Sequence, residues 1–436
     1  MQAVIMAGGH GTRLLSASKE TPKPMVRIGD APLLEHQIHN LRENGVDNII
    51  LILCHLADVI RSYFGNGEKF GVHITYYVEN SPLGTAGALT KIADQLDEHF
   101  ILVFGDLFFD IDLRRFWDYH LRKSALITLF VHPNSHPYDS DIVLTDKDGR
   151  VTGWSRKNDP FREDCPNTVN AGLYLIEKSV IPTLEEAQER RCEDKLDLEK
   201  DVIIPLIPSS CIYAYHSTEY VKDMGTPDRL ESVTSDFTSG IIARRNLSHK
   251  QRCIFLDRDG TINRFVGLVK SREELELEPR AARAIEMINH SGYLAVVITN
   301  QPVLARGECS PEEMTRIHDH LHTLLGKEGA YLDGLYFCPH HPDRGYEGEV
   351  PELKIDCDCR KPKTGLIREA ASDLNIDLTN SWFIGDTSID VLAGKNAGMR
   401  TIMLSSGSPD KGDLSIVPDQ IADDLLEAVE YIMANR

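Results

Sequence analysis

The chain has 436 residues, more than a single hydrophobic core usually supports, so we expect two domains. Its hydrophobic content of 42% and charged content of 26% are ordinary for a globular protein, and no apolar run approaches the ~20 residues that span a bilayer. The net charge of −20 argues against a protein that binds nucleic acid or a membrane surface, because such proteins carry an excess of Lys and Arg.

The start of the chain and the cysteines indicate the compartment. No basic residue precedes the first apolar segment, which runs directly into a glycine-rich loop, so no signal peptide is predicted. The nine cysteines are an odd number and most are scattered, which is typical of free thiols. We therefore expect a cytoplasmic protein.

In the first half of the chain, short β-branched runs alternate with helical patterns. The expected strands cover residues 3–6, 48–53, 74–78 and 101–104. The expected helices cover residues 34–44, 57–64 and 85–93. This alternation predicts an α/β domain with a largely parallel, Rossmann-like sheet covered on both faces.

The alternation is lost in a basic and polar stretch and then restarts. We place a linker at residues 239–251, between an N-terminal domain at 1–238 and a C-terminal domain at 252–436. The expected strands of the second domain cover residues 253–256, 294–299, 382–385 and 401–404. Its expected helices cover residues 279–289, 311–325 and 365–373. The pattern predicts a second, independent α/β domain, and there is no internal repeat.

A glycine-rich turn follows the first strand. Glycine lets backbone N–H groups approach and wrap a phosphate, but the spacing is not that of the dinucleotide-binding fingerprint. Further segments occur in a fixed order after this turn. They are "GGHGTRL" at 8–14, "TPKPM" at 21–25, "PLGTAGAL" at 82–89, "FGD" at 104–106 and "KDMGTP" at 222–227. Together they resemble the sugar-phosphate nucleotidyltransferases over roughly the first 235 residues.

The resemblance implies a role for each motif residue. The triphosphate is held by the glycine loop, namely Gly8, Gly9, Gly11, Thr12 and Arg13. Lys23 lies near the α-phosphate and is catalytic together with Arg13, while Asp106 and Asp223 bind Mg²⁺. The base lies against a loop of the guanylyltransferase type that contains Gly84, Thr85 and Gly87.

The sugar-phosphate side of this site is matched less closely. Asn170, Gly172 and Lys157 correspond to the family's pattern, although Lys157 can equally be a solvated loop lysine. The chain departs from the family at residues 15–20, where "LSASKE" replaces the usual proline-containing turn. One wall of the site is therefore not predicted.

A second phosphoryl site is predicted at "DRDGT", residues 257–261, where Asp257 and Asp259 face the same way because residues two apart in an extended chain share a face. It is followed by Thr299 in "VITNQ", Lys361 in "CRKP", and Asp386 with Asp390 in "IGDTSID". This series resembles the haloacid dehalogenase superfamily of phosphatases over about residues 253–405.

By this resemblance, Asp257 is the nucleophile that forms an aspartyl phosphate, and Asp259 is the general acid and then the general base. Thr299 and Lys361 hold the phosphoryl oxygens, and Mg²⁺ is held by Asp257, Asp386 and the carbonyl of Asp259. Asp390 has an alternative role as a carboxylate at a helix N-terminus. The short chain between Asp257 and Thr299 leaves no room for a large cap domain, so a bulky substrate can enter.

Substrate contacts are expected in two segments of this domain. Asn300, Arg306 and Arg360 are candidates, with the two arginines as grips for a second phosphate, although either can be a surface ion pair. The family branch commonly has a Ser-Gly pair after "TNQ", where this chain has Pro302 and Val303.

Four of the remaining motif residues suit a metal. "CPHH" at 338–341 and "CDC" at 357–359 provide two close pairs of ligands, as a closed tetrahedral zinc site requires. Cys338, His340, Cys357 and Cys359 match a zinc-bearing phosphatase branch, with His341 as an alternative to His340. Such a site is structural, since it leaves no open position. The other interpretation is loop cysteines beside an exposed histidine pair.

The pairing of the two domains points to a pathway. A nucleotidyltransferase consumes a sugar 1-phosphate, and a phosphatase acting on a sugar bisphosphate supplies one. The two family resemblances, taken together, imply a heptose 1,7-bisphosphate phosphatase joined to a heptose 1-phosphate guanylyltransferase. Such an enzyme uses GTP and sugar phosphates to make GDP-heptose for surface polysaccharide. Alternatives are a mannose or glucose 1-phosphate transferase with a histidinol-phosphate-like phosphatase, or one non-catalytic domain. Oligomeric state is left open.

Overall fold

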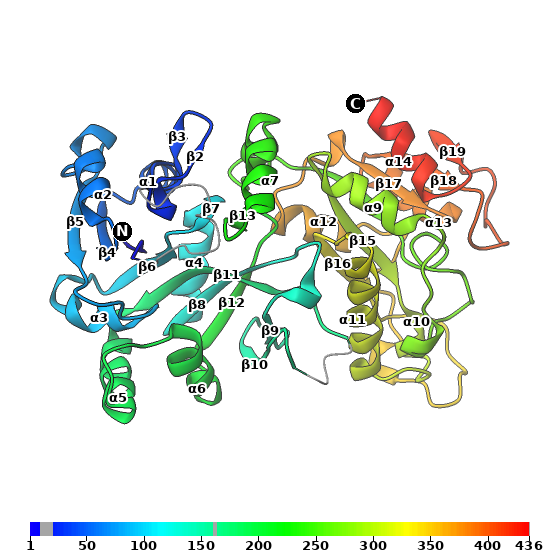
Figure 1. Cartoon of the computed structure of the whole chain (residues 1–436). Helices are drawn as coiled ribbons and strands as arrows, with labels where there is room; N and C mark the ends of the chain where they lie inside the picture. Colours follow the sequence, from blue (N-terminus) through cyan, green and yellow to red (C-terminus); the bar gives the residue numbers. More distant parts are fainter. Residues whose placement is uncertain (9–20, 160–163, 436) are drawn as a thin grey trace. The chain divides into compact units, whose positions relative to one another are not determined.

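The computed structural model describes residues 1–8, 21–159 and 164–435 (Figure 1). The chain divides into two compact units. The N-terminal unit comprises Met1–His132, Val143–Ser155 and Thr168–Asn246. The C-terminal unit comprises Pro133–Ile142, Arg156–Asn167 and Leu247–Arg436. No helix within the described ranges is both long and apolar enough to cross a membrane.

A nine-stranded sheet is the core of the N-terminal unit as far as it is described. Parallel pairing joins four of its strands, β1 (Gln2–Met6), β4 (Asn48–Leu53), β5 (His73–Val78) and β6 (His99–Phe104), of which β5 lies at the edge. These are the strands that the sequence predicts. The others were not identified: β8 (Ile127–His132), β9 (Ile142–Thr145), β10 (Val151–Ser155), β11 (Val169–Glu177) and β12 (Ile212–His216). Of these, β11 pairs antiparallel with both β6 and β8, so the sheet is mixed.

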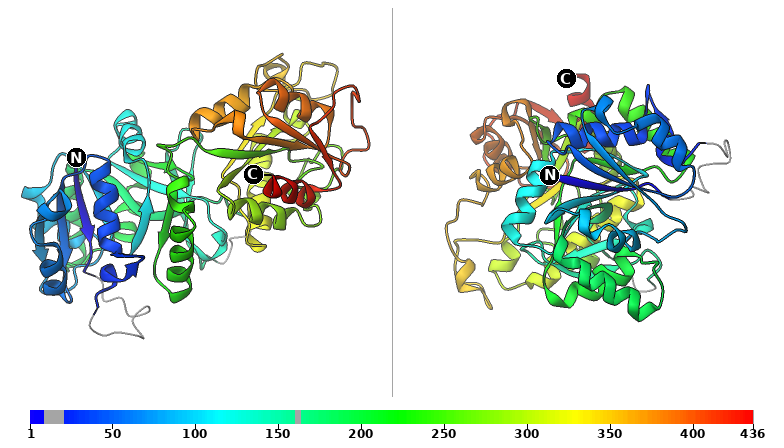
Figure 2. Two further views of the ribbon diagram at one scale, coloured as in Figure 1. Left: turned by 90° about the horizontal axis from the view of Figure 1, so that it is seen from above. Right: turned by 90° about the vertical axis from the view of Figure 1, so that its left-hand side faces the viewer.

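Helices cover both faces of this sheet (Figure 1, Figure 2). Successive side chains of a strand point to opposite sides, so these apolar strands present a hydrophobic surface on each face that the helices bury. Ile5 and its neighbours on one face pack against α1 (Leu33–Glu43), α2 (Ala57–Phe64) and α4 (Leu113–Lys123). Val4 lies on the other face, which packs against α3 (Gly87–Lys91) and α5 (Ile181–Arg191). The predicted helices at 34–44, 57–64 and 85–93 are thus confirmed, the last in shortened form.

Smaller elements complete the N-terminal unit. Two ribbons pair antiparallel, β2 (Arg27–Ile28) with β3 (Ala31–Pro32) and β7 (Leu107–Asp110) with β13 (Tyr220–Asp223). The helices are α6 (Ile204–Leu206), α7 (Pro227–Thr238) and α8 (Ile241–Arg244). The α8 turn lies inside the stretch interpreted as linker, and its Ile242 is buried.

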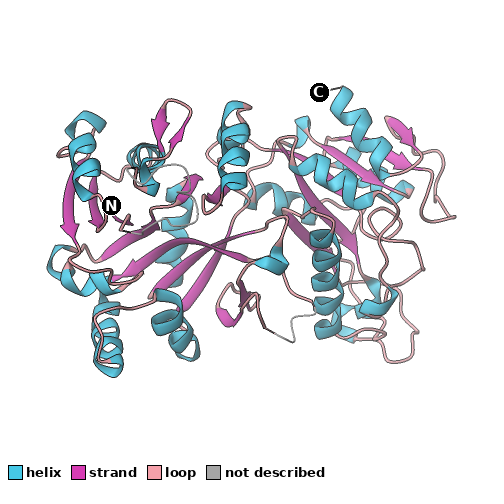
Figure 3. Ribbon diagram, in the orientation of Figure 1, coloured by secondary structure: helices cyan, strands magenta, loops and turns pink. Residues whose placement is uncertain are grey.

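The C-terminal unit contains a six-stranded parallel sheet in the order β16-β15-β14-β17-β18-β19. Its strands are β14 (Arg252–Leu256), β15 (Tyr293–Asn300), β16 (Gly334–Cys338), β17 (Trp382–Gly385), β18 (Arg400–Leu404) and β19 (Gln420–Ala422). Figure 3 shows these strands with helices beside them. The four strands predicted for this half are confirmed.

The two faces of this sheet pack against different helices. One face carries α9 (Ala281–Asn289), α11 (Pro311–Lys327) and α14 (Leu425–Ala434), while α12 (Gly365–Asp373) packs on the other. Two further helices are α10 (Pro302–Ala305) and α13 (Ser388–Asn396). Between β14 and β15 the chain holds one 3₁₀ turn, Arg272–Glu274, and α9, so no large cap domain is inserted there.

Candidate active sites and metal centre

The carboxyl ends of the parallel strands in the N-terminal unit gather the first set of polar residues. Asp106 follows β6, and its Oδ2 lies 2.5 Å from Nζ of Lys23, which belongs to the 3₁₀ turn Lys23–Met25. Asp223 ends β13, which pairs with β7 directly after Asp106. The carboxylate of Asp223 is bound by Arg229. Each predicted Mg²⁺ ligand is therefore paired with a cation at the same edge of the sheet.

The predicted triphosphate loop is described only at its start. Gly8 follows β1, and a Cβ atom on it would lie 3.1 Å from Oε2 of Glu79 and 3.2 Å from Cβ of Cys54. Glycine therefore lets the chain leave the sheet between two neighbouring strand ends. Gly9, Gly11, Thr12 and Arg13, with the departure at 15–20, lie outside the described residues, so their roles stay predictions.

Glu79 was not identified from the sequence. It follows β5 and is only 6% exposed, and its Oε1 makes no hydrogen bond with any described residue. Burial raises the pKa of Glu79, and this effect outweighs the hydrogen bond from the backbone N–H of Leu83, which lowers the pKa. The signal that was available is its position directly after a strand of the parallel part of the sheet, as for Asp106.

The predicted base loop packs against a segment from later in the chain. Thr85 N–H donates to the carbonyl of Leu196 at 2.9 Å, and Thr85 Oγ1 accepts from the N–H of Leu198 at 2.8 Å. A Cβ atom on Gly84 would lie 2.2 Å from the Leu196 carbonyl oxygen, and one on Gly87 would lie 2.3 Å from that of Asp194. Both glycines are thus required by close backbone approach.

Glu199, which immediately follows this segment, is a second residue that sequence reasoning missed. Asn170 on β11 donates to Oε1 of Glu199 at 2.6 Å, and Tyr174 donates to the same oxygen at 2.8 Å. Gly172, between them, has φ +78° at an irregularity of β11.

Lys157, predicted on the sugar-phosphate side, belongs to the C-terminal unit. Its side chain is half exposed, and its Nζ lies 3.7 Å from Oδ1 of Asp139.

The second set of polar residues lies at the carboxyl edge of the C-terminal sheet. Asp257 follows β14 and Asp386 follows β17, and the carboxylates of these two residues and of Asp390 lie within 4.8 Å of one another. Nζ of Lys361 lies 2.6 Å from Asp257 and 2.7 Å from Asp390. Asp390 is also part of the capping box of α13, which is the helix N-terminal role considered for it.

This group contains more carboxylates than cations. Burial raises the pKa of Asp257 to about 7 although Lys361 opposes the shift, and burial together with Asp390 raises the pKa of Asp386 to about 6. The cations that act on these carboxylates are Lys361 and Lys411. Because three buried carboxylates exceed two lysines, the site fits an additional cation with oxygen ligands.

Asp259 is bound within the protein rather than to this group. Arg258, Asn263 and Gln301 donate to its two carboxylate oxygens. Thr299, at the end of β15, is buried and accepts a hydrogen bond from Gln301 at 2.9 Å.

Backbone contacts fix the position of Lys361. Asn300 accepts from the N–H of Lys361 at 3.0 Å and donates to its carbonyl at 3.1 Å, joining the end of β15 to the lysine. Gly260 lies against Asp386, since a Cβ atom there would be 2.1 Å from Oδ2. The glycine of "DRDGT" therefore permits this close approach.

Three cations, Arg306, Lys354 and Arg360, lie close enough to His341 to act on its charge. The guanidinium of Arg306 lies over the ring of Tyr346 at 4.5 Å, and Nζ of Lys354 approaches the same ring at 4.5 Å. Lys354 has a fully buried side chain, and its nearest carboxylate oxygen, on Glu349, is 3.5 Å away. The positive charge of Arg306 acts on Arg360, which donates to the carbonyl of His340.

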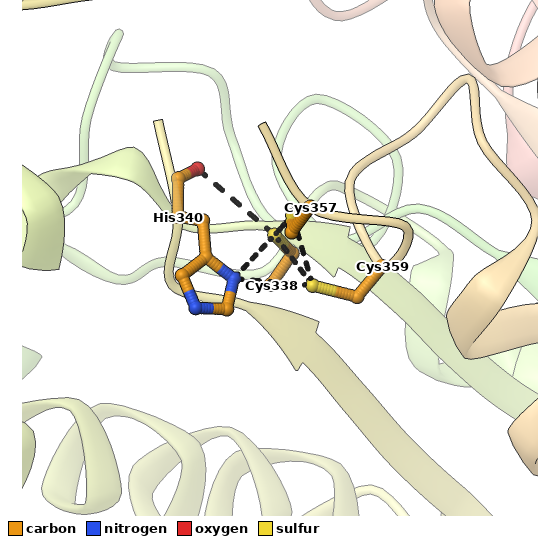
Figure 4. Close-up of side chains that lie close together, drawn as sticks. All are labelled: Cys338, His340, Cys357 and Cys359. Carbon is orange, nitrogen blue, oxygen red and sulfur yellow. Dashed lines mark hydrogen bonds between the residues drawn. The ribbon is translucent and has the colours of Figure 1, made fainter. Parts of the chain in front are cut away.

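Figure 4 shows the cysteine and histidine cluster, which joins the end of β16 to the segment before Lys361. Sγ of Cys359 lies 3.1 Å from the sulfurs of Cys338 and Cys357, and Nδ1 of His340 lies 3.2 Å from Sγ of Cys359. The ligand atoms of the four residues all lie within 4.8 Å of one another. This is a possible metal site, with a donor set that suits a tetrahedral ion. His341 is outside it.

Comparison with known proteins assigns both halves. The chain belongs to the nucleotidyl transferase family, whose model matches residues 2–240, and a HAD-hydrolase-like model matches residues 358–428. It is accordingly a bifunctional enzyme, a nucleotidyltransferase and a phosphatase in one chain.

Particular relatives resemble each half. A D-glycero-D-manno-heptose-1,7-bisphosphate 7-phosphatase of Chlorobaculum tepidum is 40% identical, covering 42% of this chain and 94% of the relative. A D-glycero-alpha-D-manno-heptose 1-phosphate guanylyltransferase of Aneurinibacillus thermoaerophilus is 31% identical, covering 52% and 94%. A mannose-1-phosphate guanylyltransferase of Mycobacterium tuberculosis is 32% identical, covering 55% and 66%.

Proposed function

We propose that this enzyme removes the C7 phosphate of D-glycero-D-manno-heptose 1,7-bisphosphate and transfers GMP from GTP to the resulting heptose 1-phosphate. The observation that carries the proposal is that one chain joins relatives of the two consecutive enzymes, a heptose bisphosphate phosphatase and a heptose 1-phosphate guanylyltransferase. The product of the first reaction is the acceptor of the second.

In the phosphatase reaction, a carboxylate oxygen of Asp257 attacks phosphorus and the bond to the C7 oxygen breaks. The proton of Asp259 passes to that oxygen, giving the C7 hydroxyl. Water then attacks the phosphorus of the aspartyl phosphate and gives a proton to Asp259, so that inorganic phosphate and the Asp257 carboxylate are released. Lys361 and Thr299 orient the phosphoryl oxygens. The balance is monoester plus water to alcohol plus phosphate.

The charge near the phosphatase site supports a bisphosphate substrate. Arg306 follows Thr299 by seven residues and Arg360 directly precedes Lys361, so both belong to segments that lead to or from the proposed phosphoryl site. With Lys354 they give three cations against two carboxylates, those of Glu349 and Asp343. This excess of positive charge suits the second, dianionic phosphate of a bisphosphate, the one that is not being removed. A substrate with a single phosphate would leave this positive charge without a partner.

In the transferase reaction, an oxygen of the sugar 1-phosphate attacks the α-phosphorus of GTP and the bond to pyrophosphate breaks. Lys23 and Arg13 neutralise the triphosphate, while Asn170 and Glu199 bind sugar hydroxyls. Little covalent chemistry is needed from the protein, so positioning and charge neutralisation account for the acceleration.

The preference for guanine rests on Glu79. Guanine presents N1–H and N2–H₂ side by side, and a carboxylate accepts both donors, whereas adenine has no such pair. Glu79 is a buried carboxylate with one oxygen that no described residue binds, next to the glycine loop. Glu79→Gln replaces one acceptor by a donor, and it should lower the preference for GTP over ATP by about 10-fold or more. An unchanged preference would exclude this role.

The side chains of the phosphatase site and of the cluster fit metal ions, while Mg²⁺ in the transferase is proposed from the family resemblance. Asp106 and Asp223 would hold Mg²⁺ in the transferase, and Asp257, Asp386 and the Asp259 carbonyl would hold it in the phosphatase, where it supplies positive charge to phosphoryl oxygens. Zinc held by Cys338, His340, Cys357 and Cys359 would be structural, because four protein ligands leave no position for a substrate.

A second candidate acceptor is mannose 1-phosphate, which the mycobacterial relative's name suggests. The deciding experiment gives the full chain Mg²⁺, GTP and synthetic anomers of heptose 1,7-bisphosphate, and follows phosphate and pyrophosphate. Mannose 1-phosphate and histidinol phosphate are the controls. We expect both products from one bisphosphate anomer. Pyrophosphate formed only with mannose 1-phosphate, or phosphate released mainly from histidinol phosphate, would contradict the proposal.

A further inference from the structure

The side chain between the two aspartates of "DRDGT" has no solvent-exposed surface. Arg258 donates through Nη2 to both oxygens of Asp259, at 2.9 Å each, and through Nε to Oδ1 at 3.2 Å. A guanidinium in this position binds the carboxylate through several hydrogen bonds and fixes the plane of the carboxylate group.

Gln301 completes this arrangement. Its Nε2 donates to Oδ2 of Asp259 at 2.8 Å and to Oγ1 of Thr299 at 2.9 Å, while its Oε1 accepts from Arg258 at 3.0 Å. One buried amide thus touches the proposed proton-transfer group, the proposed phosphoryl-binding hydroxyl and the arginine. Gln301 therefore sets the distance between the carboxylate of Asp259 and the hydroxyl of Thr299.

The other nitrogen of the guanidinium, Nη1 of Arg258, contacts neutral groups and no second carboxylate among the described residues. Its Nη1 faces Nε2 of His318 at 3.3 Å and Sδ of Met314 at 3.8 Å, both on α11. Burial, with the charge of Arg258, lowers the pKa of His318 well below its usual range, so the ring is a neutral acceptor. Asp259 is then the carboxylate that binds this buried cation.

The donors around Asp259 contact both of its carboxylate oxygens. Arg258, Asn263 and Gln301 all direct N–H groups at its oxygens, and only a carboxylate accepts them all. This charged form is produced when the leaving oxygen takes the proton, and it is the form that receives the proton of the attacking water. The same donors hold the carboxylate group in one position for both steps.

We propose that Arg258 and Gln301 are positioning residues for proton transfer: they hold Asp259 at a fixed distance from the phosphoryl group bound at Thr299. This inference rests on the proposed role of Asp259 as acid and base. A purely structural role for Arg258, as a cation that fills the core, would not require the Gln301 bridge to Thr299.

The experiment measures kcat and KM of the full chain, with Mg²⁺, for aryl phosphates whose leaving groups become progressively poorer, from p-nitrophenyl to phenyl to p-methoxyphenyl phosphate. A good leaving group needs little help from an acid, and a poor one needs much. The variants are Gln301→Leu and Arg258→Lys, with Asp259→Asn as reference. Met314→Leu is the matched control, because it touches Arg258 but not Asp259.

General acid catalysis contributes about 10²–10⁴-fold, so Asp259→Asn should lose activity mainly on the poor leaving groups. Gln301→Leu and Arg258→Lys should show the same pattern, with a loss about 10-fold greater on p-methoxyphenyl than on p-nitrophenyl phosphate, chiefly in kcat. Met314→Leu should leave the ratio unchanged.

Two results would overturn the inference differently. If Asp259→Asn steepens the dependence on the leaving group while Gln301→Leu and Arg258→Lys lower all three rates equally, the two residues are structural. If Asp259→Asn itself leaves the dependence unchanged, the role of Asp259 is wrong and the positioning role falls with it. Arg258→Lys keeps the buried charge and Gln301→Leu keeps the volume, so either variant alone suffices if the other does not fold.

Discussion

The ammonium of Lys361 lies 2.6 Å from the carboxylate of Asp257, and the side chain of the lysine is only 2% exposed. Burial opposes the charge of Lys361, but Asp257 and Asp390 outweigh it and raise its pKa. The proposed nucleophile is therefore held by a cation that comes from a distant segment of the chain. Lys361 lies two residues after Cys359, so the same short segment contributes to the cysteine and histidine cluster and to the proposed active site.

The two activities should be separable by single substitutions. Asp257→Asn removes the nucleophile, and we expect phosphate release to fall by about 10³-fold or more while guanylyl transfer to supplied heptose 1-phosphate stays near wild type. Asp106→Ala should have the opposite effect. Phosphate and pyrophosphate assays on each variant make the test. If a folded variant loses both activities, the chain has been divided wrongly.

Stabilisation by Mg²⁺ should increase with pH. The pKa values of Asp257 and Asp386 are raised to about 7 and about 6. Their contribution to stability is therefore fully present below the unfolded-state pKa and is lost as pH rises through these values. Mg²⁺ binds the deprotonated carboxylates, so it should raise the melting temperature of the C-terminal unit more at about pH 8 than at about pH 5.5.

Asp257→Asn provides the control for this linkage. It removes one of the two titrating carboxylates, so the metal-free variant should lose less stability as pH rises, and Mg²⁺ should protect it less. Thermal unfolding with and without Mg²⁺ at both pH values makes the comparison. An equal effect of Mg²⁺ at the two pH values in the unsubstituted chain would show that these carboxylates do not bind the ion.

Zinc should support the fold of the C-terminal unit and not the chemistry. Cys357→Ser removes one ligand of the cluster, and binding energy at such sites is largely folding energy. We expect lower zinc content and a melting temperature about 5–10 °C lower, since 1 kcal/mol corresponds to about 2–4 °C for a domain of this size. Cys192→Ser, at an exposed cysteine of the N-terminal unit, should change neither. A zinc-free preparation with unchanged melting and full activity would contradict this.

The sequence predicts the elements whose signal is local. "FLDRDG" and "IGDTSID" each end a buried apolar run in a carboxylate, and the structure places both at strand ends. The antiparallel β11 depends on pairing with β6 and β8, which no local pattern specifies. The mixed character of the N-terminal sheet was therefore not predictable in the same way.

The same limit applies to the sites. Glu79 has only its position directly after β5 as a signal, and its burial is what distinguishes it from a solvated carboxylate. Glu199 lies in a polar stretch, and only its contacts with Asn170 and Tyr174 of β11 distinguish it. No role is predicted for Arg258 from the sequence, although it is the largest of the fully buried side chains among the described residues. A charged residue that is wholly buried cannot be recognised from its neighbours in sequence, because its partners Gln301 and His318 come from other elements.

The two reactions should occur in a fixed order. Given heptose 1,7-bisphosphate and GTP, the enzyme should release phosphate before pyrophosphate, because a transferase pocket shaped for a C7 hydroxyl would have to desolvate a dianionic phosphate. Burying that charge without a partner costs several kcal/mol. Asp257→Asn makes the test direct: with bisphosphate and GTP it should form almost no pyrophosphate, and a separate active phosphatase should restore the reaction. Rapid pyrophosphate formation by the variant alone, giving a GDP-heptose 7-phosphate, would reverse the order and remove the reason for joining the two enzymes in one chain.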